Sequence, residues 1–462
     1  MPELPGRLLL FGGTGDLAAR YLFPALAALA GAGRLPDKFS VLASGSRDMG
    51  EEDFRAHVRQ ALADHGPDLP DDAVDRVVGM VSYRQADITD RGAVANLVEE
   101  VPGEGCVVVY LALPPAVYPD ALAGLATAKL ADATRLVVEK PFGEDLAAAR
   151  ELNRLIHEQF DERSVYRVDH FLAKQTVQNV LGLRFANRLF EPLWTNQHIE
   201  RVEITFDEAL TLEGRATYYD GTGALVDMIQ NHLLQLLCLV AMDAPSSLDG
   251  EDLRDRKVMV LRAIRVMTEE DAAASSCRAR YTAGSVDGRD VPSYVDEEGV
   301  DPDLETETFA SVTLSIDSWR WSGVPFVLRT GKALGDDRRE IAVHFKAVPH
   351  LAFGQEAQPE PNVVRLGLGP DALTVQLTMN ADGDLFDLMG LELRADLAPA
   401  ELPAYANLLL HVLEGDPTFS IRGDEAEEAW RVVEPVRQAW RAGRVPLLDY
   451  EAGSDGPSAR HR

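Results

Sequence analysis

The chain has 462 residues and a formal net charge of −30, which set the first limits on its fold and its partners. A chain of this length exceeds what one hydrophobic core usually spans, so we expect two domains. Nucleic acids are bound by clustered Lys and Arg, and so acidic a chain therefore argues against a nucleic-acid partner. Any anionic ligand would need a local group of basic residues in an acidic molecule.

Short apolar runs alternate with amphipathic stretches in the first third of the chain. The runs cover residues 8–11, 41–43, 107–111 and 136–138, and residues 54–62 have helical spacing. This alternation is typical of a parallel sheet covered by helices. We expect a Rossmann-like, doubly wound parallel sheet over residues 1–168.

After about residue 170 the pattern changes. It predicts two long helices, over roughly 173–193 and 221–242, and period-2 alternation predicts strands over 199–206 and 309–316. These features indicate an α+β domain with a large, mainly antiparallel sheet over residues 169–450. The Gly- and Ser-rich residues 451–462 have little to bury, and we expect a flexible tail.

No segment of the sequence has the pattern of a secretory signal, and residues 233–240 are too few to span a bilayer. The three cysteines lie far apart and form no CxxC pair, which favours a reducing compartment. We therefore expect a cytoplasmic protein without a membrane partner and without a metal site.

A Gly-rich turn follows the first apolar run. It comprises Gly12, Gly13, Thr14, Gly15, Asp16 and Leu17. Glycines in such a turn let the backbone approach a pyrophosphate, and the first helical turn favours the anion. The spacing is not GxGxxG, and a plain turn between strand and helix would also use glycine.

The second apolar run ends near Ser46, Arg47 and Asp48. At this position of a dinucleotide fold, an arginine binds the 2′-phosphate of NADP, whereas a carboxylate binds the ribose hydroxyl of NAD. Ser46 and Arg47 favour NADP, and Asp48 leaves NAD possible.

Two later segments fall at expected strand ends and would line the cofactor. Tyr118 follows a diproline, and Lys140 lies in Glu-Lys-Pro-Phe-Gly, where the Lys140–Pro141 bond could be cis. An ordinary turn is the alternative for both segments.

His232 is the candidate proton acceptor. It has Met228 and Ile229 one turn before it and Leu236 one turn after it, at the edge of an apolar stripe. Burial makes an imidazole less basic and a neighbouring carboxylate restores its basicity, so Asp169 is the candidate partner. A histidine that only packs in the core would occupy the same kind of position.

Five further residues could bind a phosphorylated sugar. His170 and Lys174 are four residues apart and, if a helix begins here, would converge on a phosphate. Asp227 and Glu208 could accept hydrogen bonds from sugar hydroxyls, and Lys332 follows an apolar strand and a glycine.

These segments resemble, in their order and spacing, the glucose-6-phosphate dehydrogenase family. The Gly12–Leu17 turn is similar to the family's Gly-x-x-Gly-Asp-Leu fingerprint, and the resemblance extends from about residue 7 to residue 450. The segments that carry it further are Leu113–Tyr118, Glu139–Gly143, Arg167–Lys174, Phe206–Glu208, Glu213–Arg215, Tyr218–Asp220, Asp227–His232 and Arg329–Lys332.

The resemblance implies an NADP-dependent oxidation of glucose 6-phosphate at C1, a reaction of the pentose phosphate pathway, in a homodimer or homotetramer. It implies that His232 is the proton acceptor and Asp169 its partner. It implies a phosphate site of His170 and Lys174, and sugar contacts from Lys140, Glu208, Asp227 and Lys332. It implies that the cofactor is bound by Gly12–Leu17, Arg47, Tyr118 and Lys140.

The chain departs from the family pattern at positions near the expected substrate site. Phe171, Ala173 and Gln175 stand where family members usually have Tyr, Gly and Glu, and Asp337, followed by Arg338, replaces a basic residue. These departures leave open a different sugar phosphate or a preference for NAD. A non-catalytic nucleotide-binding or assembly paralogue is the alternative of another class.

Overall fold

The computed structural model describes residues 4–102, 106–212, 219–353, 359–383, 385–398 and 400–458. Glu213–Arg215 and Tyr218, which carry part of the resemblance, lie outside the described residues, as do residues 459–462. The chain divides into two compact units. The first comprises Met1–Lys174, Pro245–Asp255 and Ala400–Glu427, and the second comprises Gln175–Ala244, Arg256–Pro399 and Glu428–Arg462.

The first unit is built on a seven-stranded sheet with the order β17-β6-β5-β4-β1-β2-β3. All neighbours run parallel except β17, which is antiparallel to β6. The strands are β1 Arg7–Phe11, β2 Ser40–Gly45, β3 Val81–Gln85, β4 Val107–Leu111, β5 Arg135–Glu139, β6 Val165–Val168 and β17 Ser420–Ile421. The order 3-2-1-4-5-6 of the first six strands is that of a dinucleotide-binding doubly wound sheet. The Rossmann-like fold expected from the sequence is thereby confirmed.

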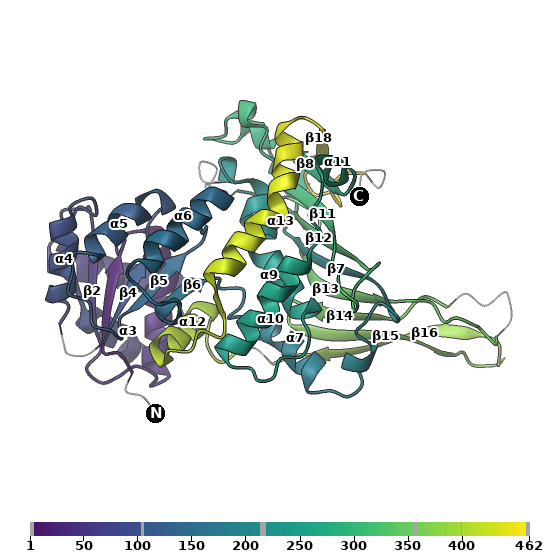
Figure 1. Ribbon diagram of the computed structural model, residues 1–462, viewed down its shortest axis with the longest axis horizontal. Helices are drawn as coiled ribbons and strands as arrows, with labels where there is room; N and C mark the ends of the chain where they lie inside the picture. The colour runs from purple at the N-terminus through teal and green to yellow at the C-terminus, as the bar shows by residue number, and fades with distance from the viewer. Residues whose placement is uncertain are drawn as a thin grey trace. The chain divides into compact units, whose positions relative to one another are not determined.

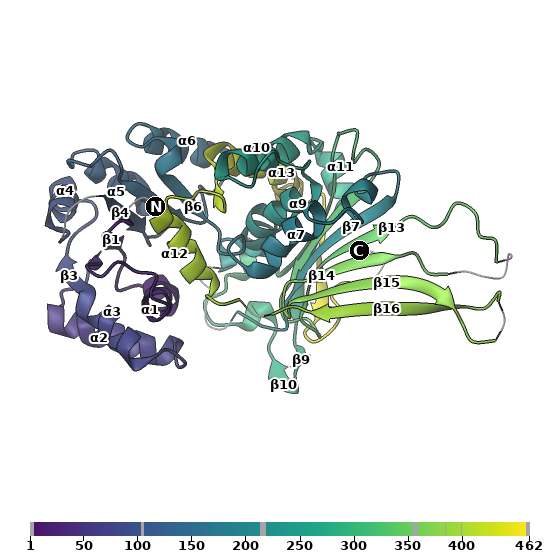
Figure 2. The same cartoon turned by 90° about the horizontal axis from the view of Figure 1, so that it is seen from below.

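Helices cover both faces of this sheet, with α1, α2 and α3 on one side and α4, α5 and α6 on the other (Figure 2). Because both faces are covered, β4 is buried at all five positions and reads as an uninterrupted apolar run. The helical segments are η1 Ala18–Leu22, α1 Phe23–Gly31, α2 Glu51–His65, α3 Asp71–Met80, α4 Arg91–Glu100, η2 Pro115–Val117, α5 Tyr118–Leu125, α6 Leu146–His157, η3 Glu162–Ser164 and α12 Ala404–Glu414.

The second unit contains a nine-stranded sheet with the order β16-β15-β14-β13-β7-β12-β11-β8-β18. Only the pairs β7–β12 and β8–β18 are parallel among its described strands. The strands are β7 Ile199–Asp207, β8 Ser276–Thr282, β11 Phe309–Ser315, β12 Pro325–Gly331, β13 Arg338–Phe345, β14 Val363–Gly367, β15 Ala372–Asn380, β16 Leu388–Asp396 and β18 Leu447–Glu451. This mainly antiparallel sheet confirms the expected α+β class.

Helices lie beside this sheet, and β15 and β16 extend away from them as a long hairpin (Figure 1). The remaining elements of the unit are α7 Gln175–Phe185, η4 Glu191–Leu193, η5 Leu225–Leu233, α9 Leu234–Ala241, α11 Glu269–Ala274, the hairpin of β9 Gly284–Val286 and β10 Arg289–Val291, η6 Tyr294–Asp296 and η7 Pro302–Leu304. Two helices, α10 Gly250–Ala263 and α13 Gly423–Arg441, begin in the first unit and continue in the second.

The helix expected over 173–193 is shorter than predicted: α7 begins at Gln175 and ends at Phe185. The side-chain amide of Asn187 donates to the carbonyls of Gly182 and Leu183, at 3.1 and 3.2 Å, and so occupies acceptors of the last turn. The helix expected over 221–242 is present as the π-helical η5 followed by α9.

The expected domain boundary at residues 168/169 and the flexible tail stay predictions. Ala452 and Pro457, which follow β18, are buried. None of the described helices combines the length and apolar character that crossing a bilayer requires.

Candidate active site

The Gly-rich turn joins β1 to the helix that starts at Asp16. Gly12 has φ +79°, and a Cβ there would lie 2.0 Å from the carbonyl oxygen of Ala112. The N–H groups of Gly12 and Gly13 both donate to the carbonyl of Ser44, at 2.8 and 2.9 Å. An anion at this turn would therefore meet the first helical turn rather than these two glycines. Only glycine at position 12 allows this close approach to the Ala112 carbonyl, so the residue is required by the packing of the turn itself.

Ser46 and Arg47 follow the carboxyl end of β2, and both side chains are exposed. Asp48 is exposed as well. All three are available to a ligand at the edge of the sheet where parallel α/β folds bind nucleotides.

Lys140 follows β5, and its environment is set by buried neighbours. The hydroxyl of Tyr118 donates to the backbone carbonyl of Glu139 at 3.0 Å, and the hydroxyl of Tyr110 donates to the Glu139 carboxylate. Burial raises the pKa of Glu139 to about 7, against the opposing effects of the Tyr110 hydrogen bond and the Lys140 charge. The Lys140–Pro141 peptide is cis.

Asp169 follows β6 directly and is only 2% exposed. Its Oδ1 accepts a hydrogen bond from the N–H of Phe171 at 2.9 Å. Successive turns link residues 169–174, and α7 begins only at Gln175. A helix that begins at His170, the condition under which His170 and Lys174 would share one face, is therefore not present, because the Asp169 carboxylate holds the chain in turns here.

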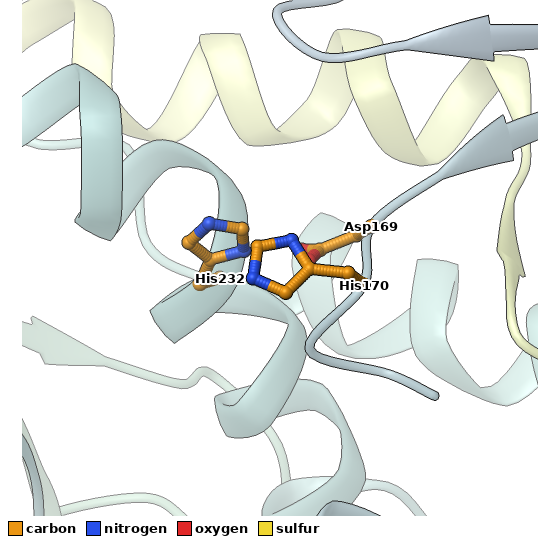
Figure 3. A group of neighbouring side chains, drawn as sticks. All are labelled: Asp169, His170 and His232. Carbon is orange, nitrogen blue, oxygen red and sulfur yellow. The ribbon is translucent and has the colours of Figure 1, made fainter. Parts of the chain in front are cut away.

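The side chains of this loop lie against aromatic rings of the same unit. The His170 ring stacks on Tyr405 of α12 at 5.4 Å between centroids, and Tyr405 stacks on Tyr21 at 4.9 Å. The Nζ of Lys174 lies 3.8 Å from the centroid of Phe171. Phe171, which lacks the family's usual hydroxyl, thus contributes a cation–π contact. Figure 3 draws Asp169 and His170 on the loop after β6.

His232 belongs to the second unit, in the last turn of η5, and is 1% exposed (Figure 3). The side-chain amide of Asn231 donates to the backbone carbonyl of Val226 at 2.9 Å, one turn earlier in the π-helical segment. At the start of η5 the N–H of Leu225 donates to the Glu307 carboxylate at 2.9 Å. Burial raises the pKa of Glu307 to about 7.

Glu208 and Lys332 form an ion pair, with Oε2 and Nζ 2.8 Å apart. The Lys332 ammonium also lies 5.4 Å from the ring centroid of Tyr219. After burial, the charge of Asp227 is the largest influence that raises the pKa of Tyr219. Four residues of the second unit are therefore near one another: Glu208, Lys332, Tyr219 and Asp227. The sequence predicted all of them except Tyr219 as substrate-binding residues.

The sequence assigned no role to Tyr219, which lies in the Tyr218–Asp220 segment, and did not single out Arg339. Arg339 Nη2 lies 3.7 Å from Glu208 and 2.9 Å from Asp337, and its Nε is buried without a hydrogen-bond partner among the described residues. Arg338 instead pairs with Glu340 at 2.8 Å. Neighbouring residues of a strand face opposite sides of the sheet. This two-residue period was the signal in the sequence that could have distinguished Arg339 from Arg338.

Each unit thus carries one set of the expected residues. The first unit gathers the Gly-rich turn, Arg47, Lys140 and Asp169 at the carboxyl ends of the strands of one parallel sheet. The second unit carries Asp227 and His232 on η5, and Glu208 and Lys332 at the ends of β7 and β12.

Comparisons with known proteins match one family along nearly the whole chain. The family model "Glucose-6-phosphate dehydrogenase, NAD binding domain" matches residues 9–179, and "Glucose-6-phosphate dehydrogenase, C-terminal domain" matches residues 181–462. A glucose-6-phosphate 1-dehydrogenase of Treponema pallidum is 40% identical, covering 98% of this chain and 92% of the relative. One of Zymomonas mobilis is 39% identical, covering 99% and 97%.

Solved structures give the same result. A crystal structure of glucose-6-phosphate 1-dehydrogenase from Mycobacterium avium has a TM-score of 0.87 and 35% identity, covering 99% of this chain and 96% of that one. A glucose-6-phosphate dehydrogenase in complex with its substrate has a TM-score of 0.89 and 30% identity, covering 100% and 97%.

Proposed function

Because the chain belongs to the glucose-6-phosphate dehydrogenase family, we propose that it oxidises D-glucose 6-phosphate at C1 to 6-phospho-D-glucono-1,5-lactone, with NADP as the hydride acceptor. This is a reaction of the pentose phosphate pathway. The observation that carries the proposal is the buried His232 in an Asp-Met-Ile-Gln-Asn-His segment, within a chain that is similar to the family over its full length.

In the proposed reaction His232 accepts the proton of the C1 hydroxyl while the C1 hydride leaves, so that a carbonyl forms at C1. Asp169 pairs with the imidazole, fixes its tautomer and stabilises the imidazolium. NADP supplies the electron-accepting nicotinamide when it is bound. A positioned base of this kind contributes about 10²- to 10⁴-fold to the rate.

Substrate binding is assigned to basic and acidic residues of both units. His170 and Lys174 bind the phosphate, while Lys140, Glu208, Asp227 and Lys332 bind the sugar. The Glu208–Lys332 ion pair supports this assignment, because both side chains are partly exposed, at 17% and 16%, and keep hydrogen-bonding capacity for hydroxyl groups.

The cofactor assignment rests on the Gly12–Leu17 turn, Ser46, Arg47, Tyr118 and Lys140. The exposed arginine after β2 favours NADP, since a 2′-phosphate adds a charge-assisted hydrogen bond. NAD with the same mechanism is the alternative, and the exposed Asp48 is the observation that favours it. The thiols of Cys106 and Cys277 are free, which supports a cytoplasmic location.

We propose in addition that the chain forms a homodimer or homotetramer through its large sheet. The outer hairpin of β15 and β16 exposes apolar side chains that a monomer would leave in water. They are Met379, Met389, Leu391 and Leu393, with exposed fractions of 53%, 50%, 36% and 52%. Clustered exposed apolar groups of this kind mark association surfaces.

Initial rates followed at the reduced-nicotinamide absorbance band test the function. Glucose 6-phosphate, other hexose phosphates and glucose are each compared with NADP and with NAD. We expect the highest kcat/KM for glucose 6-phosphate with NADP. Equal rates on unphosphorylated glucose would contradict the phosphate role of His170 and Lys174. An absence of reduced nicotinamide with every pair would favour a non-catalytic paralogue.

A further inference from the structure

The loop after β2, which carries Ser46 and Arg47, is supported by the neighbouring strand β3. The two strands run parallel, with Ala43 opposite Tyr83 and Gly45 opposite Gln85. Tyr83 is 3% exposed, and its ring stacks on Phe54 of α2 with centroids 4.8 Å apart. The core therefore fixes the ring of Tyr83 independently of its hydroxyl.

The Tyr83 hydroxyl donates toward two carbonyls of this loop. It lies 2.7 Å from the carbonyl oxygen of Arg47 and 3.0 Å from that of Gly45. Gln85 adds a hydrogen bond from its side-chain amide to the carbonyl of Ser46 at 3.0 Å. Three successive carbonyls thus accept from β3 side chains, which fixes the backbone of residues 45–47 while the Ser46 and Arg47 side chains stay exposed.

The same loop contacts the Gly-rich turn. Gly12 and Gly13 donate to the carbonyl of Ser44, and a Cβ at Gly45 would lie 2.9 Å from Thr14 Oγ1 and 3.3 Å from the Tyr83 hydroxyl. The turn expected at the pyrophosphate and the loop expected at the 2′-phosphate are therefore held in one arrangement, with the Tyr83 hydroxyl between β3 and the loop.

Arg47 and Asp48 are the charged groups that act on the titratable side chains next to the loop. Burial, and after it the positive charge of Arg47, lower the pKa of His57 on α2. Burial raises the pKa of Tyr83, the Arg47 charge lowers it and the Asp48 charge raises it. Tyr83 therefore stays a protonated donor, with Arg47 as the nearby cation.

We propose that Tyr83 is a positioning residue for cofactor selectivity, because its hydroxyl fixes residues 45–47 so that Ser46 and Arg47 meet the 2′-phosphate of NADP. The inference rests on the proposed use of NADP. NAD has no 2′-phosphate, so loosening this loop weakens the use of NADP more than the use of NAD. A role limited to packing would affect both cofactors alike.

The test compares Tyr83→Phe with the unaltered chain in kcat/KM for NADP and for NAD at saturating glucose 6-phosphate. The phenylalanine keeps the ring on Phe54 and removes only the hydroxyl. Ser82→Ala is the matched control, because Ser82 also donates from β3 to a β2 carbonyl, that of Val41 at 3.2 Å, but away from the loop. Thermal unfolding of all three proteins checks that each is folded.

The expected result is a fall of about 2- to 10-fold in the NADP to NAD ratio of kcat/KM for Tyr83→Phe, as one neutral hydrogen bond is lost. Ser82→Ala should keep the ratio of the unaltered chain. An unchanged ratio in Tyr83→Phe, or an equal loss with both cofactors, would overturn the inference. Failure of the proposed function is a separate outcome, since the unaltered chain would then reduce neither cofactor.

Discussion

The carboxylate of Glu208 lies 2.8 Å from the ammonium of Lys332. Hydrogen bonds made by their backbone groups hold both residues in place. The N–H of Glu208 donates to the carbonyl of Gly331 at 2.9 Å, and the hydroxyl of Tyr450 donates to the carbonyl of Lys332 at 2.6 Å. The pair is thus a rigid, partly exposed group of one donor and one acceptor at the ends of two adjacent strands.

Replacing Lys332 by Ala should raise KM for glucose 6-phosphate by roughly 10- to 100-fold, because a charged hydrogen bond is worth about 1.5–3 kcal/mol. We expect a smaller change in kcat, since proton removal is assigned to His232. Steady-state kinetics measure both. Lys346→Ala is the control, because the Lys346 ammonium donates to the exposed carbonyl of Asn196, away from this group. Equal KM values for the two variants would argue against a substrate role for Lys332.

Arg339 and Arg338 offer a second matched pair. Arg339 lies beside Glu208, whereas Arg338 pairs with Glu340 and Glu203. We expect Arg339→Ala to raise KM for glucose 6-phosphate several-fold, because it removes a second cation near Glu208, beside Lys332, and the ion pair with Asp337. Arg338→Ala should leave KM nearly unchanged. The opposite order of effects in the same kinetic assay would contradict this account of the Asp337 position.

The buried carboxyl of Glu307 predicts a pH dependence of stability. Its pKa is about 7 in the folded chain against an ordinary value of 4.5. Between these values the folded state binds one proton more than the unfolded state, so the free energy of unfolding falls as pH rises from about 4.5 to about 7. Glu307→Gln removes this contribution, and it should be more stable relative to the unaltered chain at pH 8 than at pH 5, by on the order of 1–3 kcal/mol.

Urea unfolding of both proteins at the two pH values measures that difference. The pKa of Glu139 is raised as well. Because Glu139 is present in both proteins, its contribution to the pH dependence cancels in the comparison. A stability difference between the two proteins that is the same at pH 5 and pH 8 would contradict a Glu307 carboxyl that titrates near neutral pH.

The fold class could be predicted because local pattern and global structure agree. Each apolar run of the first third became a strand, for instance 107–111 as β4, and the alternating residues 309–316 became β11. The end of α7 could not be predicted, because it depends on the side chain of Asn187 competing for helix carbonyls. The π-helical winding of η5 could not be read from a 3.6-residue period either.

The sequence predicted which residues belong to the site, but it did not predict the contacts between them. The ion pair of Glu208 and Lys332 joins residues that are 124 positions apart. Arg339 was passed over because the basic residue was sought at position 337, and only the alternation along β13 distinguishes it from Arg338. Tyr83 was missed because β3 has a weak apolar pattern, in which Arg84 and Gln85 are exposed.

The kcat of His232→Asn with glucose 6-phosphate and NADP tests the central claim most directly. The account predicts a fall of about 10²- to 10⁴-fold relative to the unaltered chain, with a folded protein and little change in KM, because His232 takes the proton as the hydride leaves. A kcat equal to that of the unaltered chain would contradict it.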